Sequence, residues 1–353
     1  MNKIFIWDDY SDQPKILNKK DKKFLRKGYL LDFLKLLGTN IIFLPYLFFK
    51  FLLKKDTPLI MKNSHSLYGV CVNLDKGDKQ HELVEELGVK SLQIRFFLHD
   101  MKRIDTYVEF VKKFGKDKEI LITIIQDREH IENHMLLMQD IELVFEKFKD
   151  ICVEYQIGNA VNRIKWAFIS MEEYVSFYKI IQKVRDNKFP ELKLIGPSVI
   201  DFEYHYIVRI LFNRVNVHYD KVSSLLYVDR RGSPFSSQMM FFDLKNKIEF
   251  LDTIVRNSTK TEDHIYLTEV NWPIRGTAPY APTSEKECID EELYTQYMLE
   301  YFDIAKKTGK IEKIFWHQLI AAGYGLVDDR EGKLRKRDAF YAFKQRIAED
   351  FHD

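Results

Sequence analysis

From about Leu67 onward, short runs of β-branched and aromatic residues alternate with longer stretches whose apolar positions recur at a helical period. This alternation predicts repeated strand–helix units around a parallel sheet. Gly88 and Gly309 end two of the helical stretches, where glycine supplies a left-handed C-cap. We expect eight strands, at residues 67–74, 91–97, 119–125, 151–157, 192–196, 214–219, 264–269 and 313–318. Eight such units close naturally into a barrel, so the predicted fold class is an α/β (β/α)8 TIM barrel over residues 61–353.

A doubly wound sheet is the competing architecture. It usually has five or six strands and a glycine-rich phosphate turn after the first strand, and no such turn is present here. Neither GxGxxG nor GxxxxGK[ST] occurs in the chain, which argues against a Rossmann or P-loop nucleotide site. Because barrel enzymes build their sites from strand-to-helix segments, the long ones mark the expected working end. These segments are 158–170, 220–238, 270–287 and 317–336.

The composition is that of a globular protein, with 46% hydrophobic and 31% charged residues. Its three cysteines, Cys71, Cys152 and Cys288, lie far apart and form no CxxC pair, which favours a reducing, cytoplasmic location. The ten histidines form no HExxH or HxH pair, and we see no carboxylate cluster at ligand spacing. We therefore expect neither a metal nor another cofactor.

The net charge of +2 hides a local excess of basic residues. Residues 1–60 carry 12 Lys or Arg against 6 Asp or Glu, which leaves a net charge of −4 for the rest of the chain. A nucleic-acid-binding domain would show a basic face across its folded body, so we expect no nucleic-acid partner. The first residues also lack the basic, apolar and small-residue regions of a secretory signal, and we expect no export.

A cluster of basic residues between positions 19 and 27 precedes an apolar stretch from Tyr29 to Leu53. The longest uncharged run, Leu36 to Phe49, falls short of the roughly 20 residues that cross a bilayer. Pro45 would also kink a helix there, so we expect no membrane crossing. Two interpretations of residues 19–55 remain. The segment is either an in-plane anchor on an anionic membrane surface, or a helical hairpin packed on the barrel with solvated lysines.

Two short motifs stand at the expected ends of strands four and seven: YQIGNAVNR (155–163) and YLTEVNW (266–272). They resemble the motifs of the retaining glycoside hydrolases that have a (β/α)8 barrel and two catalytic glutamates. The resemblance implies that Glu269 is the nucleophile. In the first motif Gly158, Asn159 and Asn162 match the family, but Ala160 stands where the acid/base glutamate belongs. The resemblance therefore implies that the usual proton donor is missing.

The same resemblance implies further sugar-contacting positions, namely Arg95, His218, Tyr219, Trp316 and Tyr324. Trp272, Trp316 and His317 could offer the apolar platform and hydrogen bond that a pyranose requires, although a barrel Trp is also consistent with core packing. Other candidates have a structural alternative as well. Asn159 could hydrogen-bond its own loop, and Arg163, with Lys165 and Trp166, could bind an acidic sugar or phosphate or form a solvated helix start.

The missing donor matters because a retaining glycosidase needs two carboxyl groups about 5–5.5 Å apart. Loss of acid–base help typically costs about 10²–10⁴ in rate. One remedy is a substitute acid from another loop, for which Glu203 and His205 in DFEYHY are preferred. Side-chain alternation is expected to point another candidate, Glu154, outward. The remaining candidates are Asp127, Glu129, Asp201 and Asp220.

A second remedy is a substrate whose leaving group is a phosphate, which needs little protonation. The third possibility is a site that binds a glycan without cutting it. The sequence therefore predicts a carbohydrate-active protein that uses O-glycosidic or phosphate-linked sugars. Such a protein would act in cell-surface polysaccharide metabolism or on lipid-linked precursors at the cytosolic membrane face. The alternative prediction is a non-catalytic glycan-binding protein or scaffold.

Overall fold

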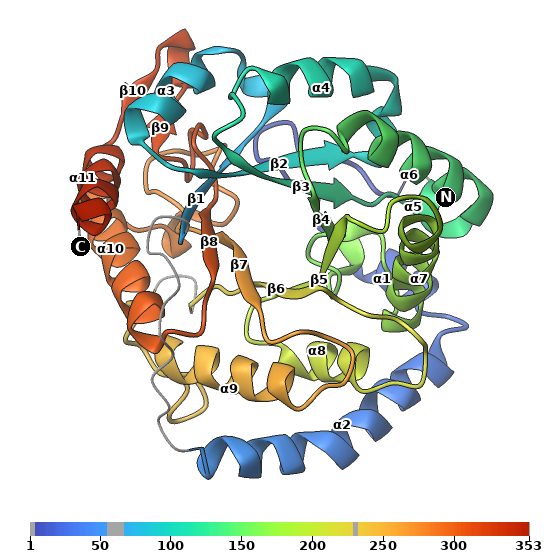
Figure 1. Ribbon diagram of the computed structural model, residues 1–353. Coiled ribbons are helices and arrows are strands. Elements are labelled where there is room, and N and C mark those ends of the chain that lie inside the picture. The colour runs from blue at the N-terminus through green and yellow to red at the C-terminus, as the bar shows by residue number, and fades with distance from the viewer. Residues whose placement is uncertain (1–3, 55–66, 229–231, 353) are drawn as a thin grey trace.

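Eight parallel strands close into a barrel with helices packed around it, which confirms the predicted fold (Figure 1). The computed structural model describes residues 4–54, 67–228 and 232–352, so the expected domain boundary at residue 60 lies outside the described residues. Consecutive strands pair with one another, and β8 pairs with β1 to complete the barrel. The strands are β1 (Tyr68–Val72), β2 (Ser91–Phe97), β3 (Glu119–Ile125), β4 (Glu154–Ile157), β5 (Lys193–Ile200), β6 (Lys221–Leu225), β7 (Ile265–Val270) and β8 (Lys313–Trp316).

Most α-helices of the described residues cover the outside of the barrel between consecutive strands, while two of these α-helices precede β1 and one follows β8 (Figure 1). A short two-stranded sheet, β9 (Val327–Asp328) with β10 (Arg335–Lys336), lies after β8. The α-helices are α1 (Lys19–Leu25), α2 (Leu30–Leu52), α3 (Lys79–Leu87), α4 (Ile104–Lys112), α5 (Arg128–Glu132), α6 (His134–Phe148), α7 (Met171–Lys188), α8 (Tyr204–Leu211), α9 (Leu244–Arg256), α10 (Glu291–Thr308) and α11 (Asp338–His352).

Polar side chains cap the start of α7 and of α10, and glycines end α3 and α10. The side chains of Ser170 and Asp290 accept hydrogen bonds from backbone N–H groups in the first turns of α7 and α10. Gly88 and Gly309 adopt φ values of 79° and 61° at the C-caps of α3 and α10. Both glycines are therefore left-handed helix ends, as predicted from the sequence.

The predicted sixth strand is wrong. Residues 214–219 lie in the connection that precedes β6, and the strand itself is the next segment, Lys221–Leu225. Its Ser223 and Ser224 are buried: the hydroxyl of Ser223 lies 2.8 Å from that of Ser198, and Ser224 donates to the carbonyl oxygen of Val199 at 3.2 Å. Two consecutive serines interrupt the apolar alternation by which a strand is recognised in a sequence.

Side chains along the strands alternate between the inside and the outside of the barrel. Leu121, Ile195, Tyr266 and Phe315 form a cluster of their own, while their apolar sequence neighbours belong to the large core between the sheet and the helices. Gly69 on β1 makes room for Phe315, because a Cβ at that glycine would lie 2.5 Å from the ring. The inside of the barrel is thus a packed core.

Charged residues close the amino-terminal end of the barrel. Glu154 on β4 accepts a hydrogen bond from Tyr266 at 2.9 Å and forms ion pairs with Lys221 at 2.9 Å and Lys313 at 3.5 Å. These partners come from β7, β6 and β8, so Glu154 points inward rather than outward as expected. Burial raises the pKa of this carboxyl, but the charges of Lys313 and Lys221 outweigh burial and hold the pKa below its ordinary value.

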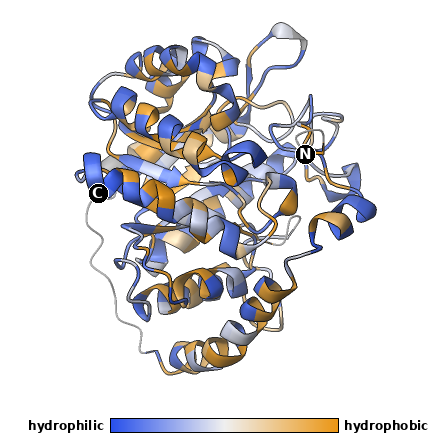
Figure 2. Cartoon of the chain, turned by 90° about the vertical axis from the view of Figure 1, so that its right-hand side faces the viewer, coloured by the Kyte–Doolittle hydropathy of each residue, from blue (hydrophilic) through white to orange (hydrophobic). Residues whose placement is uncertain are grey.

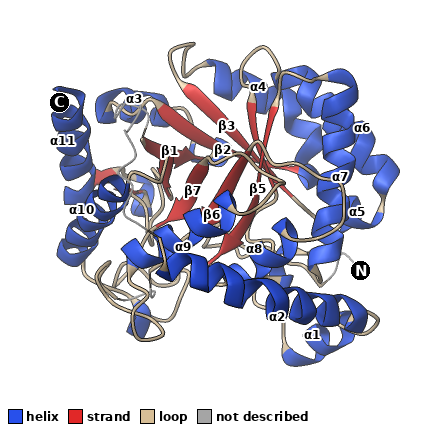
Figure 3. Cartoon of the chain, turned by 60° about the horizontal axis from the view of Figure 1, so that its bottom comes forward, coloured by secondary structure: helices blue, strands red, loops and turns tan. Residues whose placement is uncertain are grey.

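The N-terminal segment is part of the barrel's surface. Trp7 bridges to Pro14 and packs edge-on against Phe97 and Trp166, so residues 4–18 lie over the carboxyl ends of the strands. α2 lies against α8 and α9 (Figures 1 and 3). Pro45, expected to kink a helix, lies inside α2. Although no membrane crossing was expected from the sequence, this helix is long and apolar enough to cross a membrane by length and composition.

Candidate functional site

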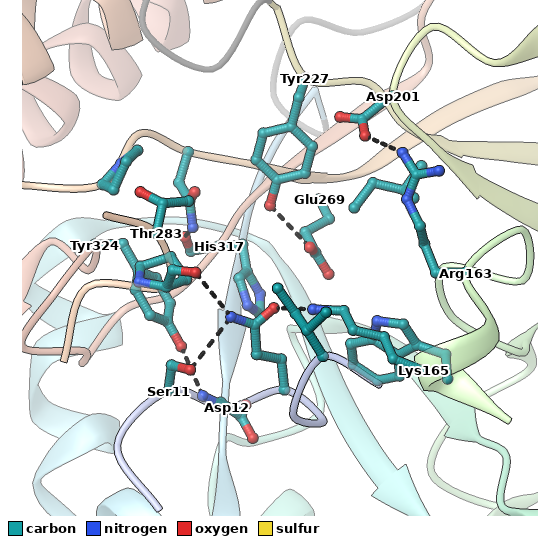
Figure 4. A pocket seen from close by; sticks show the side chains of 17 residues that line it. Ser11, Asp12, Arg163, Lys165, Asp201, Tyr227, Glu269, Thr283, His317 and Tyr324 are labelled. Atoms are coloured by element: carbon teal, nitrogen blue, oxygen red, sulfur yellow. Dashed lines mark hydrogen bonds and ion pairs between the residues drawn. The ribbon is translucent and has the colours of Figure 1, made fainter. Parts of the chain in front are cut away.

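A cavity of about 150 Å³ lies at the carboxyl ends of the strands, the end predicted to carry the site (Figure 4). The loops after β4 to β8 form most of its wall, and the N-terminal segment contributes Ser11, Asp12, Gln13 and Ile16. The contribution of the N-terminal segment was not predicted. The cavity therefore needs both parts of the chain.

Glu269 stands near the end of β7 and reaches the cavity (Figure 4). Its side chain is held from two sides. The Tyr227 hydroxyl donates to Oε1 at 2.8 Å, and the Asn159 amide Nδ2 lies 3.4 Å from Oε2. Burial, with the Glu269 carboxylate next to it, raises the pKa of Tyr227 well above its usual value, so this phenol stays a hydrogen-bond donor. Glu269 thus presents a fixed carboxylate to the cavity.

The loop after β4 brings Asn159 to Glu269 but turns Ala160 away from the cavity. The Gln126 side chain clamps the backbone of Asn159, accepting from its N–H at 3.0 Å and donating to its carbonyl oxygen at 2.9 Å. Ala160 has a φ of 45°, is completely buried and belongs to the large apolar core. It is not among the residues that line the cavity. Position 160 therefore supplies no carboxyl group to the cavity and forms no part of its wall.

Asp12 belongs to the N-terminal segment, and three side chains from the barrel hold its carboxylate. Arg95 and Gln318 donate to its carboxylate at 2.5 Å each, and Asn73 donates at 3.2 Å. Arg95 is only 2% exposed and does not line the cavity, although it was predicted to contact sugar. Burial lowers the pKa of Arg95, but the nearby carboxylates of Asp12 and Glu269 outweigh burial and raise it. Arg95 therefore joins the N-terminal segment to the site.

Aromatic rings enclose the rest of the Arg95 guanidinium. Its Cζ lies 5.3 Å from the ring centroid of Trp166, 5.4 Å from that of Phe97 and 6.0 Å from that of Trp7. Such cation–π contacts favour a buried charge. Its Nε and Nη2 atoms have no hydrogen-bond partner among the described residues, so the rings and Asp12 supply the observed contacts.

His317 and Tyr324, both predicted site residues, line the cavity after β8. Their rings stack with centroids 5.6 Å apart and planes 11° from parallel, and the Tyr324 hydroxyl accepts from the backbone N–H of Asp12 at 3.3 Å. Burial lowers the pKa of His317, which favours the neutral imidazole at neutral pH. A neutral imidazole can donate to or accept from a sugar hydroxyl.

Arg163 lines the cavity, but its guanidinium is already engaged by two acidic residues. It donates to Glu203 at 2.8 Å and forms an ion pair with Asp201. Asn162 donates to Glu203 at 2.7 Å and also holds the backbone of Ile200, so it fixes the loop rather than facing the cavity. Glu203, the preferred substitute acid, does not line the cavity either, whereas Asp201 does.

The predicted tryptophan platform lies in the core. Trp272 and Trp316 are at most 1% exposed and stack on each other with centroids 6.0 Å apart. The indole N–H of Trp316 donates to Tyr294 at 2.7 Å, and that of Trp272 donates to the carbonyl oxygen of Gly232 at 3.2 Å. Neither ring lines the cavity. The tryptophan that does so is Trp166, after β4.

Three other predicted site residues lie away from the cavity. His205 is on α8, where its carbonyl oxygen accepts from Asn40 of α2 at 2.9 Å. His218 and Tyr219 precede β6 instead of following it, which places them at the amino-terminal end of the barrel. There the ligand atoms of His218, Asp220 and Glu262 lie within 4.8 Å of one another, a spacing that could hold a metal ion.

Sequence reasoning missed Asp12 and Tyr227 as site residues. Tyr227 was overlooked because strand six was placed too early, so the residue did not appear to follow a strand end. Asp12 carried no signal, since it lies in an N-terminal segment interpreted as separate from the barrel. A correct sixth strand would have identified Tyr227 by the same rule that identified Glu269, since both follow or end a barrel strand.

No family model and no curated protein matches the chain, but solved structures match its fold. A family 39 glycoside hydrolase from Bacteroides cellulosilyticus WH2 is 13% identical with a TM-score of 0.59, and the match covers 82% of this chain and 65% of that enzyme. The family 1 β-glucosidase of Thermotoga maritima is 12% identical with a TM-score of 0.56, covering 83% and 99%.

A third similar structure is β-glucuronidase 2 of Bacteroides uniformis, covalently bound to cyclophellitol-6-carboxylate aziridine. It is 13% identical with a TM-score of 0.56, and the match covers 81% of this chain and 35% of that one. At these identities the likeness concerns the fold. The chain therefore has a glycoside-hydrolase-like barrel, and the roles of Glu269 and Ala160 stay predictions.

Proposed function

We propose that the protein is a carbohydrate-active enzyme in which the Glu269 carboxylate attacks the anomeric carbon of a bound sugar. The observation that carries this proposal is the placement of Glu269 in the cavity, where Tyr227 and Asn159 hold its two oxygens. A carboxylate fixed at the carboxyl end of a barrel strand occupies the position from which barrel enzymes act. The glycoside-hydrolase-like fold supports the same chemistry.

The leaving group of the proposed reaction departs without help from position 160. Besides Glu269, the carboxylates that line the described cavity are Asp12 and Asp201, and each is paired with an arginine. A sugar phosphate suits such a site because the departing phosphate carries its own negative charge. Lys165 in the cavity wall supports the choice, since a cationic side chain binds phosphate well, whereas the guanidinium of Arg163 is engaged by Glu203 and Asp201.

The proposed reaction runs in two steps. A Glu269 oxygen forms a bond to the anomeric carbon while the bond from that carbon to the phosphate oxygen breaks, and the phosphate leaves with the electron pair. Water then displaces the carboxylate from the anomeric carbon, and its proton passes to solvent. Glu269 is regenerated and no redox partner is needed.

We expect the protein to consume glycosyl fluorides and glycosyl phosphates but to cleave matched alkyl glycosides at least about 10²-fold more slowly. The reason is that an alkoxide leaves poorly without a proton donor, whereas fluoride and phosphate do not need one. Product formation, measured over a panel of sugars, gives kcat/KM for each activated sugar and for its matched alkyl glycoside. Equal rates for alkyl and activated glycosides would show that another residue donates a proton.

A non-catalytic glycan-binding protein is the second candidate function. The burial of Ala160 in the core favours it, because the acid/base position is not merely vacant but outside the cavity wall. This candidate predicts calorimetric binding of a glycan with no release of fluoride or phosphate from any activated donor of the same sugar.

A further inference from the structure

The side of α2 that faces away from the barrel is largely apolar, with the exposed Lys35 and Lys50 among its residues. Consecutive positions of a helix turn by about 100°, so the exposed apolar residues cover about half of its circumference. Figure 2 shows this helix as a largely hydrophobic element at the edge of the molecule. Ten large apolar side chains are each at least 48% exposed: Leu30, Leu31, Leu34, Leu37, Ile41, Ile42, Tyr46, Phe49, Leu52 and Leu53. Monomeric soluble proteins rarely expose so continuous an apolar face.

The opposite side of α2 is docked on the barrel. Leu47 is completely buried, and the ring of Phe43 packs on that of Phe212 with centroids 4.8 Å apart. Ion pairs hold the helix at two places: Lys35 in α2 pairs with Glu172 at 2.5 Å, and Lys54, just after the helix, pairs with Glu249 at 2.8 Å. A helix held along one side by a folded barrel cannot also cross a bilayer, so its exposed side is suited to lie in a membrane surface.

Immediately before α2, the chain carries a compact positive cluster. Lys19, Lys22, Lys23, Arg26 and Lys27 line one shallow hollow of the surface, and none of them forms an ion pair with a carboxylate of the described residues. Unpaired cations beside an apolar face match the chemistry of an anionic lipid surface, in which headgroups attract the charges and acyl chains receive the apolar side chains.

The apolar face continues into the loop between β6 and α9. Met239 and Met240 are 75% and 95% exposed, and the neighbouring Phe241 ring lies 5.8 Å from that of Phe48 on α2. A second hollow, of about 410 Å³, is lined by Met239 and also by Asp201 and Tyr227 of the sugar cavity. This loop therefore lies between the apolar face and the candidate site.

We infer that α1, the exposed side of α2 and the Met239–Phe241 loop form a docking face that lies flat on an anionic membrane. The face would place the second hollow at the bilayer surface, next to the sugar cavity. Resting on the proposed function, this geometry names a substrate class, a sugar attached through phosphate to a membrane lipid.

Co-sedimentation with vesicles tests the docking face in the full-length protein. We expect the protein to bind phosphatidylcholine vesicles that contain about 30% phosphatidylglycerol, and to bind pure phosphatidylcholine at least about fivefold more weakly. Raising the salt concentration should weaken binding, because the attraction of the cations is screened. A wild-type protein that stays in the supernatant with both vesicles would overturn the inference.

Matched triple variants separate the docking face from general effects of charge. L34E/I41E/F49E should lower vesicle affinity about tenfold or more, whereas M135E/L143E/Y341E adds the same charge to apolar residues exposed elsewhere and should bind like wild type. K22A/K23A/R26A should lose most of the preference for anionic vesicles, unlike K102A/K116A/K179A. Equal binding by the face variants and their controls would contradict the proposal.

The vesicle assay is independent of catalysis, so Glu269→Gln should bind vesicles as wild type does even if it turns over no sugar. Sedimentation velocity without lipid examines the other occupant of this face, a second copy of the chain. A dimer that L34E/I41E/F49E converts to a monomer, in a protein that ignores vesicles, would assign the face to self-association and overturn the membrane inference.

Discussion

Replacing Glu269 with glutamine is expected to lower kcat/KM for an activated sugar by about 10³-fold or more. The substitution replaces the nucleophilic carboxylate by a neutral amide, so both the attacking group and the negative charge that stabilises the transition state are lost, and the loss of one electrostatic group alone costs about 10²–10³. The amide keeps the shape of the side chain, and its oxygen can still accept from Tyr227. Steady-state kinetics with the best glycosyl fluoride provides the measurement.

Glu203→Gln is the matched control for that loss. Glu203 lies near the same loops but outside the cavity wall, so its variant should lose no more than about tenfold. A large loss in Glu203→Gln with little change in Glu269→Gln would exchange their roles and support the substitute acid that the sequence favoured. Retained sugar binding by Glu269→Gln, measured by calorimetry, shows that the cavity is intact.

The second large effect concerns stability. Glu154→Gln is expected to lower the free energy of unfolding by about 3 kcal/mol at pH 7, the lower end of the range for breaking a buried ion pair. In the wild type the Glu154 carboxylate lies between Lys221 and Lys313 at the amino-terminal end of the barrel. Without it, the positive charges of the two lysines repel each other. Urea denaturation of the variant and the wild type measures the difference.

This difference should depend on pH with a definite sign. Because the folded pKa of Glu154 lies below its ordinary value, the carboxylate contributes stability above the unfolded pKa of about 4.3 and loses it as the pH falls through the folded pKa. The gap between wild type and variant should therefore be constant from pH 7 to about pH 5 and shrink below about pH 4. A gap that widens on acidification would contradict the assigned shift.

Glu312→Gln is the appropriate control for the stability effect. Glu312 also pairs with Lys221, at 2.8 Å, but its side chain is 35% exposed against 15% for Glu154. A more solvated pair contributes less, so we expect a loss of at most about 1 kcal/mol. Similar losses in both variants would mean that burial does not distinguish the two carboxylates.

The sequence was sufficient for the barrel because most of its strands are apolar on the outer side, where they meet helices. Ile120 and Ile122 on β3, for example, belong to the large outer core. β6 shows the limit of this pattern, since Ser223 and Ser224 find polar partners in Ser198 and the Val199 carbonyl oxygen of β5, and two consecutive serines give a weak strand signal. Because strand six was predicted too early, His218 and Tyr219 were expected at the carboxyl end of the barrel, whereas they lie at its amino-terminal end.

For the candidate site, the sequence predicted those residues that follow a strand directly and failed for those that depend on a loop path. Glu269 and His317 line the cavity as expected. Ala160 lies three residues beyond β4, and with a positive φ it turns into the core. Asp12 is held at the cavity by its ion pair with Arg95 of β2. The two residues lie far apart in the sequence, so no local pattern reveals this contact.

Mapping a covalent label by peptide mass spectrometry tests the role of Glu269 most directly. The protein is incubated with cyclophellitol-type aziridines of several sugar configurations, which react with an attacking carboxylate, and then digested. We expect a single adduct on the peptide that contains Glu269, and no adduct in Glu269→Gln. An adduct on Asp12 or Asp201 instead, or no adduct with the aziridine of a sugar that the protein turns over, would contradict it.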